Sequence, residues 1–192
     1  MRAVRVALSR KLKSANPLQI IDAATRLKAK GLDWFGWELI YAHKPTLKSI
    51  NRDAVEALGQ GMASWQETDG FGMILAGPAW LHGRIADRDI ERWARSEDLW
   101  WRRAALVATT GLNNKTRGGR GDAARTLKIV ELLIDDREDM IVKAVSWALR
   151  MLAPWQPKAV EDFVAAHGDR LAPRVKREVR NKLRTGYKNP KS

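Results

Sequence analysis

Hydrophobic residues recur every three to four positions along most of the chain, which is the period of amphipathic α-helices. The pattern is regular near the C-terminus, where every fourth residue from 171 to 183 is hydrophobic and the arginines lie on another face (Leu171, Val175, Val179, Leu183). No segment shows the strict alternation of hydrophobic and polar residues that is typical of a half-buried strand. The pattern therefore predicts an all-α protein.

Capping residues and helix breakers divide this pattern into segments of about ten to fifteen residues. We expect helices over 2–13, 17–30, from Asp33 to Pro45, from Asn51 to about residue 62, from Ser64, and over 87–94, 98–112, 122–134, 138–152, 157–167 and 173–185. Asn16, Asp33, Asn51 and Ser64 are the expected N-caps, and Glu67 completes a capping box with Ser64. Glycines after Asp69 predict an irregular segment, and residues 113–121 form the clearest loop.

Helices that recur in pairs, joined by short turns, are typical of a helical-repeat solenoid. We therefore predict an all-α fold of the HEAT-like type, an α–α superhelix with a concave face, while a compact helical bundle is the alternative. With 192 residues the chain fits one domain over residues 1–192. Residues 186–192 are expected to form a basic C-terminal tail.

The chain is strongly basic, with 35 Lys and Arg against 22 Asp and Glu and a net charge of +13. The excess lies at the two ends, in residues 1–48 and 168–192, and such a balance favours polyanionic partners, although solvated helix faces can look similar. The chain has no cysteine, and its three histidines lack ligand spacing, so we expect no metal site. No apolar run is long enough for a membrane span, which suggests a cytoplasmic protein.

Trp65 and Asp69 are four residues apart and would lie on one helix face, one turn from each other. A carboxylate in a basic DNA-binding groove repels phosphate and so needs a compensating purpose. One such purpose is to stabilise the positive charge that develops on a deoxyribose when a glycosidic bond breaks. The alternative is a surface aspartate that pairs with an arginine.

Two later segments carry the same mixture of tryptophan and cations. Trp147 lies between Lys143 and Arg150 on one helix face, where it could contact nucleic acid or be covered by their alkyl stems. Arg103 follows the tandem Trp100-Trp101, of which one should pack inward. Arg103 could bind a phosphate through its planar fork, or pair with a nearby carboxylate.

Together, residues 64–69, 98–105 and 143–150 resemble the AlkD-like DNA alkylation repair family, and the resemblance extends over roughly residues 50–185. It implies a HEAT-like solenoid whose concave, basic face cradles duplex DNA. It also implies that Trp65 and Trp147 are active-site tryptophans and that Asp69 is the catalytic carboxylate. Among DNA-binding residues, we expect Arg103 and Arg150, with Lys143, Arg102 and Trp101 as further contacts.

The resemblance implies a monofunctional DNA glycosylase that excises N3- and N7-alkylated purines from duplex DNA without extruding the base and without a metal or organic cofactor. We expect a monomer of bacterial type, associated with the nucleoid. Two features depart from the family pattern: the chain should be shorter at its N-terminus, and Ser64 and Gln66 flank Trp65 where a second aromatic residue is usual. The alternative functions are a non-catalytic module that binds DNA shape or damage and a protein-interaction scaffold.

Overall fold

The computed structural model describes residue 7 and residues 10–190. Over these residues the chain forms helices and connecting turns and contains no strand, which confirms the predicted all-α class. Most of the helix expected over 2–13 lies outside the described residues.

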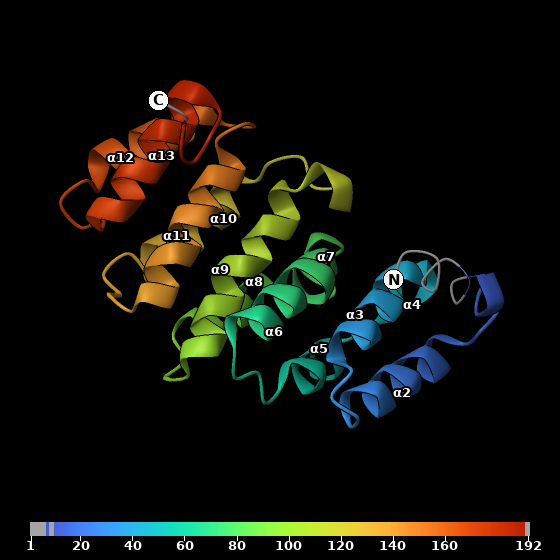
Figure 1. Cartoon of the computed structure of the whole chain (residues 1–192). Helices are drawn as coiled ribbons and strands as arrows, with labels where there is room; N and C mark the ends of the chain where they lie inside the picture. Colours follow the sequence, from blue (N-terminus) through green and yellow to red (C-terminus); the bar gives the residue numbers. More distant parts are fainter. Residues whose placement is uncertain (1–6, 8–9, 191–192) are drawn as a thin grey trace.

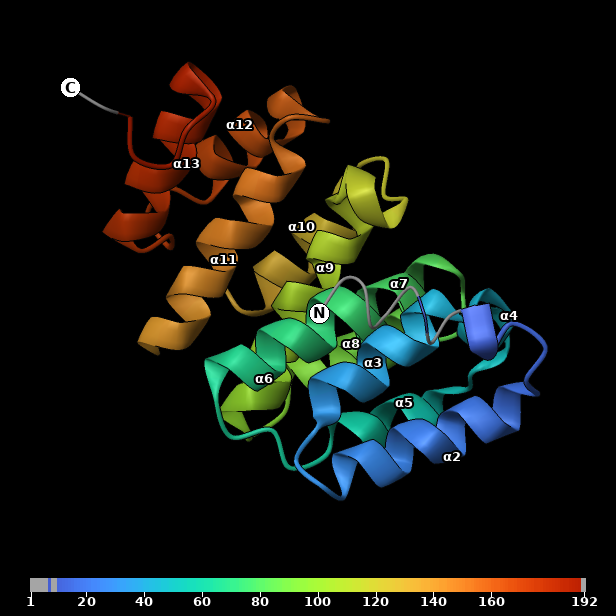
Figure 2. The same ribbon diagram turned by 45° about the vertical axis from the view of Figure 1, so that its right-hand side comes forward.

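The helices form two layers (Figure 1 and Figure 2). In the first layer each helix packs against the next, in the order α3 (Asp33–Ala42), the joined segments α6 (Trp65–Gly70), η1 (Phe71–Ala76) and α7 (Gly77–Leu81), then α9 (Leu99–Asn113), α11 (Asp139–Leu152) and α13 (Pro173–Thr185). The second layer contains α2 (Pro17–Lys28), α5 (Arg52–Gly59), α8 (Asp87–Ala94), α10 (Ala123–Leu132) and α12 (Pro157–Ala166). Two short segments, α4 (Lys44–Ser49) and the 3₁₀ helix η2 (Lys115–Arg117), complete the structure. This is the predicted helical-repeat architecture.

Most helix starts follow from local capping. Asn16 Oδ1 accepts a hydrogen bond from the Leu18 amide at 2.9 Å, and Asn51 caps α5 in the same manner. Ser64 Oγ accepts from the Glu67 amide at 3.3 Å. The carboxylate of Glu67 accepts from the amide of Ala63, one residue before the predicted partner. These side chains satisfy backbone donors that the first helical turn leaves free.

Two predicted boundaries of α3 are wrong. Asp33 is the first residue of α3 instead of its cap, because its carboxylate is engaged by Lys28 Nζ at 3.1 Å. Pro45 lies in the first turn of α4 and does not end α3. A proline is well tolerated in a first turn, where no intrahelical bond needs its missing N–H group.

The segment after Asp69 is helical, not irregular as predicted. Helices α6, η1 and α7 run without a break from residue 65 to residue 81, and η1 is a π-helix. The glycines serve close packing against α9: a Cβ at Gly72 would lie 2.6 Å from Val107 Cγ1, and one at Gly77 would lie 2.6 Å from the Ala108 carbonyl oxygen. Burial against α9 therefore outweighs the low helix propensity of glycine.

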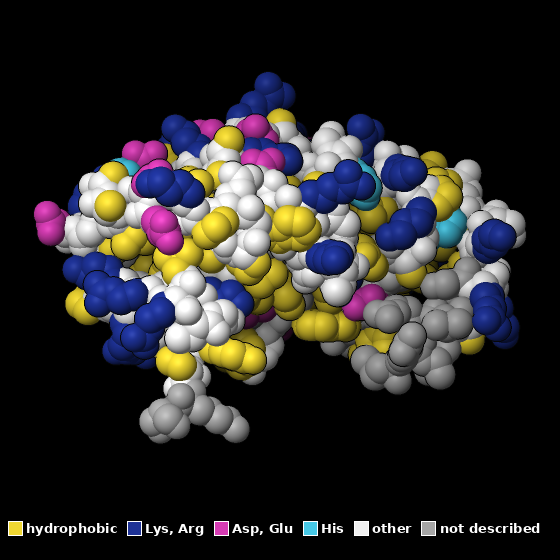
Figure 3. Space-filling view, turned by 90° about the horizontal axis from the view of Figure 1, so that it is seen from above, with side chains coloured by type: hydrophobic (Ala, Val, Ile, Leu, Met, Phe, Trp, Pro, Cys, Tyr) yellow, Lys and Arg dark blue, Asp and Glu magenta, His cyan; other side chains and the backbone are white. Residues whose placement is uncertain are grey.

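The predicted loop over 113–121 contains η2 and is attached to the body at its ends. Asn113 Oδ1 accepts from the Asp122 amide at 3.0 Å, and Trp155 Nε1 donates to the Asn113 carbonyl at 2.7 Å. Gly121 has φ +85° and lies under Trp155, so a side chain would not fit there. Figure 3 shows Lys and Arg side chains on both halves of the face seen from above Figure 1, with two histidines among those on the right-hand half.

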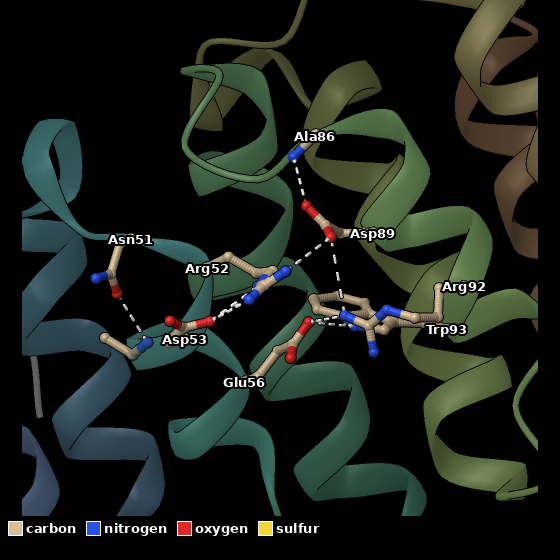
Figure 4. A network of polar contacts seen from close by, with 9 residues as sticks. Asn51, Arg52, Asp53, Glu56, Ala86, Asp89, Arg92 and Trp93 are labelled. Carbon is tan, nitrogen blue, oxygen red and sulfur yellow. Dashed lines mark hydrogen bonds and ion pairs between the residues drawn. The ribbon is translucent and has the colours of Figure 1, made fainter.

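Polar contacts join α5 to α8 in the second layer (Figure 4). Glu56 accepts hydrogen bonds from Arg92 and, at 3.0 Å, from Trp93 Nε1, while Arg52 lies 3.8 Å from Asp89. The Trp93 ring itself is buried in the core. These contacts fix the second layer behind the helices that carry the candidate site.

Candidate nucleic-acid interface

Asp69 and Arg103 form a two-pronged ion pair between α6 and α9. Arg103 Nε donates to Asp69 Oδ1 and Nη2 donates to Oδ2, both at 2.9 Å. Arg103 Nη1 donates to the carbonyl of Met140 at the start of α11. The two side chains are only 6% and 13% exposed. The guanidinium of Arg103 is therefore buried and holds the carboxylate, which is the pairing that the sequence left open as the alternative, while a phosphate contact of Arg103 stays a prediction.

The environment of Asp69 acts on its charge in two directions. Burial raises the pKa of Asp69 above the ordinary carboxyl value, and the hydrogen bonds and charge of Arg103 oppose that shift. Because the guanidinium binds both oxygens, we expect the carboxylate to be ionised at neutral pH. An ionised carboxylate that is partly removed from water interacts more strongly with a nearby positive charge than one on the open surface.

Exposed aromatic rings lie beside Asp69. Trp65, the first residue of α6, is 47% exposed and precedes Asp69 by one helical turn. Trp34 of α3 is 41% exposed, and its six-membered ring packs so closely on Gly70 that a Cβ there would lie 2.6 Å away. Trp34 was not among the predicted site residues, because the pattern of hydrophobic residues around it fits an ordinary helix that faces the core. Only the packing of α3 against α6 reveals it.

Trp147 is half-buried on α11. It follows Met140 by seven residues, or two turns, and therefore lies on the same face roughly 10 Å further along the helix. Arg103 thus connects Asp69 to the helix that carries Trp147. Among the described residues no ring contact joins Trp147 to Trp65. The structure therefore brings Asp69 and Arg103 into direct contact. It places Trp147 on α11, which α9 separates from α6 in the first layer.

Two other predicted DNA contacts are occupied inside the protein. Arg102 Nε donates to Asp136 Oδ2 at 2.8 Å, and its Nη1 donates to the carbonyls of Ser96 and Glu97. The Trp101 ring packs against Phe71 and Trp93, with centroids 5.8 and 4.9 Å apart. Arg102 therefore holds the start of α9, and both Trp100 and Trp101 pack against the core, while DNA contacts of Arg102 and Trp101 stay predictions.

Arg150 and Lys143, which flank Trp147, differ in how they are held. Arg150 is 18% exposed, donates from Nε to Ser146 Oγ at 3.1 Å and lies 3.8 Å from Glu178. Burial lowers the pKa of Arg150, and the charge of Glu178 opposes this. Lys143 is exposed and pairs with Asp139 one turn earlier at 2.6 Å. Arg150 is thus held by internal contacts, whereas Lys143 lies on the surface beside Asp139, and phosphate contacts of both residues stay predictions.

Glu178 is a second buried carboxylate that was not predicted. It is 5% exposed and accepts from Ser146 Oγ at 2.5 Å, with Lys188 Nζ 3.3 Å away. Desolvation acts to raise the pKa of Glu178, but the contacts of Ser146, Lys188 and Arg150 outweigh it and lower the pKa. Lys188 belongs to the predicted basic tail, so residues 186–190 of that tail fold back onto α13.

Within residue 7 and residues 10–190, no group of three or more His, Asp and Glu side chains could hold a metal ion. In the same part of the chain, no helix is both long and apolar enough to cross a bilayer.

A protein-family model described as DNA alkylation repair enzyme matches residues 3–183 of the chain. No curated protein and no solved structure matches the chain. The family match covers α2 to α11 completely and includes Trp34, Asp69, Arg103 and Trp147.

Proposed function

Because the chain belongs to the DNA alkylation repair enzyme family, we propose that it is a monofunctional glycosylase that releases N3- and N7-alkylated purines from duplex DNA. The observation that carries the proposal is the Asp69 carboxylate, which Arg103 orients through two hydrogen bonds one turn from the exposed Trp65. The orientation of the carboxylate is set before substrate binds, as electrostatic catalysis requires.

Cleavage of the glycosidic bond in such a nucleotide requires mainly a negative charge held beside the sugar. A purine alkylated at N3 or N7 already carries positive charge and leaves as a neutral base when the bond from its nitrogen to C1′ breaks. The bonding electrons depart with the base, and positive charge develops on the sugar. Asp69 stabilises that charge and orients a water molecule, whose oxygen bonds to C1′ and whose proton passes to the carboxylate and then to solvent. The products are the free base and an abasic site.

The exposed tryptophans supply contact with the cationic nucleotide. The face of an indole ring attracts a cation within about 6 Å, and the effect is larger where water is excluded. Trp65 begins the helix that carries Asp69, Trp34 packs on the next residue, Gly70, and Trp147 offers a further ring on α11. A preference for positively charged bases over neutral ones follows from this arrangement.

The direct test is release of methylated purine from alkylated duplex DNA. Asp69→Asn keeps the shape of the side chain but removes its charge, and we expect base release to slow by about 10²- to 10³-fold while DNA affinity stays within twofold. Asp162→Asn on α12 removes an exposed carboxylate and serves as the matched control. Wild-type protein that binds alkylated DNA but releases no base would overturn the proposal and favour a non-catalytic DNA-binding module.

A further inference from the structure

A basic pocket lies at the other end of the helix that begins with Trp65. It has a volume of about 660 Å³ and is bounded by α4, the end of α7, the 113–121 loop and the start of α10. Its lining includes Lys44, Lys48, His82, Arg117 and Arg120. Leu81 follows Asp69 by twelve residues, so the pocket is roughly 18 Å from Asp69 along the helix axis.

The cations of this pocket exceed the carboxylates near them. Lys44, Lys48 and Arg120 form no ion pair with any described residue. Arg117 lies 3.6 Å from Glu38. Asp122 is the acidic residue of the lining, and Arg125 already engages it at 2.6 Å. The pocket therefore keeps positive charge that the protein itself does not neutralise.

The cations that line the pocket repel one another, which agrees with the excess of positive charge there. Burial lowers the pKa of Lys44, and the charges of Arg117 and Lys48 lower it further. Burial likewise lowers the pKa of His82, helped by Lys44, Lys48 and Arg84. A bound anion would relieve these repulsions, since opposite charge at close range favours the protonated forms.

Packing holds the cations in place. Lys44 Nζ lies 4.0 Å and Arg117 Cζ 4.3 Å from the centre of the Tyr41 ring. Gly119 is pressed against the backbone of α9, where a Cβ would lie 2.5 Å from the Leu112 carbonyl oxygen. Because Lys44 and Arg117 lie over the Tyr41 ring, that ring is already engaged by cations. The surplus of positive charge suits the pocket to phosphate groups.

We propose that this pocket is a phosphate-binding site, which holds backbone phosphates of the DNA whose damaged nucleotide contacts Trp65 and Asp69. The proposal rests on the proposed function for the identity of its ligand. The DNA backbone fits better than a free phosphorylated molecule, because the pocket is wide and open and its cations come from several elements. In addition, Arg103 is paired with Asp69 and only 6% exposed, so other cations must supply the charge that binds DNA.

The test is the salt dependence of binding to unmodified duplex DNA. In the double variant Lys48→Ala/Arg120→Ala, two exposed side chains without internal partners are removed, so folding should be unaffected. Each lost phosphate contact lowers the slope of log affinity against log salt by about 0.9, and we expect a fall of about 1 to 2 and at least tenfold weaker binding at low salt. The control Lys30→Ala/Arg88→Ala removes the same charge from exposed positions of the second layer.

Equal slopes in the two double variants would overturn the proposal. A parallel measurement with inorganic pyrophosphate separates the two sources of phosphate: pyrophosphate binding that is lost in Lys48→Ala/Arg120→Ala, with an unchanged DNA slope, would also overturn the assignment to the DNA backbone. Because the slope is measured on undamaged DNA, it reports on the pocket even if the protein releases no base.

Discussion

Cationic side chains near the two ends of the continuous helix over residues 65–81 differ in whether they are paired with carboxylates. At the Trp65 end, Arg103 is bound by Asp69, and on the neighbouring first-layer helices Arg150 lies beside Glu178. At the Leu81 end, Lys44 and Lys48 lie one turn apart and form no ion pair with a carboxylate of the described residues. The same side-chain chemistry thus orients a carboxylate at one end and leaves charge available for a ligand at the other.

Paired cations and unpaired cations therefore contribute differently: the former to the geometry of the site and the latter to DNA affinity. A buried ion pair recovers little of its desolvation cost, so its clearest benefit is a fixed orientation. Unpaired cations at the surface contribute to binding through the release of counterions from DNA. We infer that the Asp69 end determines which bond is broken and that the pocket end contributes to how tightly the duplex is held.

The largest effect on stability should come from breaking the pair itself. Arg103→Ala leaves Asp69 half-buried without a partner, and we expect the free energy of unfolding to fall by about 3–5 kcal/mol, as measured by urea denaturation. Arg103→Lys keeps the charge but loses the two-pronged geometry, so it should recover part of the stability and little of the base release. Unchanged stability together with weaker DNA binding in Arg103→Ala would instead identify Arg103 as a phosphate contact.

Asp69 and Glu178 should respond to acid with opposite signs. The pKa of Glu178 is lowered in the folded protein, so its stabilising contribution is present above the ordinary value of 4.5 and is lost as the pH falls through the lowered pKa. The pKa of Asp69 is raised, so its folded state gains relative stability as the pH falls through that raised pKa toward 3.8.

The measurement is the unfolding free energy of wild type, Glu178→Gln and Asp69→Asn between about pH 3 and pH 6. The amount by which the unfolding free energy of wild type exceeds that of Glu178→Gln should shrink toward acid pH. Over the same range, the unfolding free energy of wild type should rise relative to that of Asp69→Asn. Parallel curves for all three proteins would contradict the opposite shifts.

The smallest effects are expected from the exposed rings. Trp65→Ala removes a ring that is 47% exposed, so stability should change little while base release slows by about tenfold, the value of one cation–π contact. Trp34→Ala also removes packing on Gly70 and should lower the melting temperature as well as the rate. Trp34→Phe retains that packing and is the control. A Trp34→Ala protein with the wild-type rate would limit the aromatic surface to Trp65 and Trp147.

Much of the fold could be predicted because its determinants are local. Asn16, Asn51, Ser64 and Asp98 each cap a helix through bonds to amides two or three residues away. The resemblance of three short segments also identified the family. The segment with Gly72 and Gly77 was mispredicted, because the residues that make it helical belong to α9, about thirty residues further along the chain.

By itself, the sequence determined the helix pattern, the basic ends and the candidate residues around Trp65, Asp69 and Trp147. Only the tertiary structure decided which cations are paired. Arg103 meets Asp69 across 34 residues, and Arg150 approaches Glu178 on the next helix of the layer. Trp34 and the Lys44–Lys48 pocket depend on the same layer packing. The physical reason is that capping bonds form within one turn of chain, whereas the partner of a long charged side chain depends on which helix packs beside it.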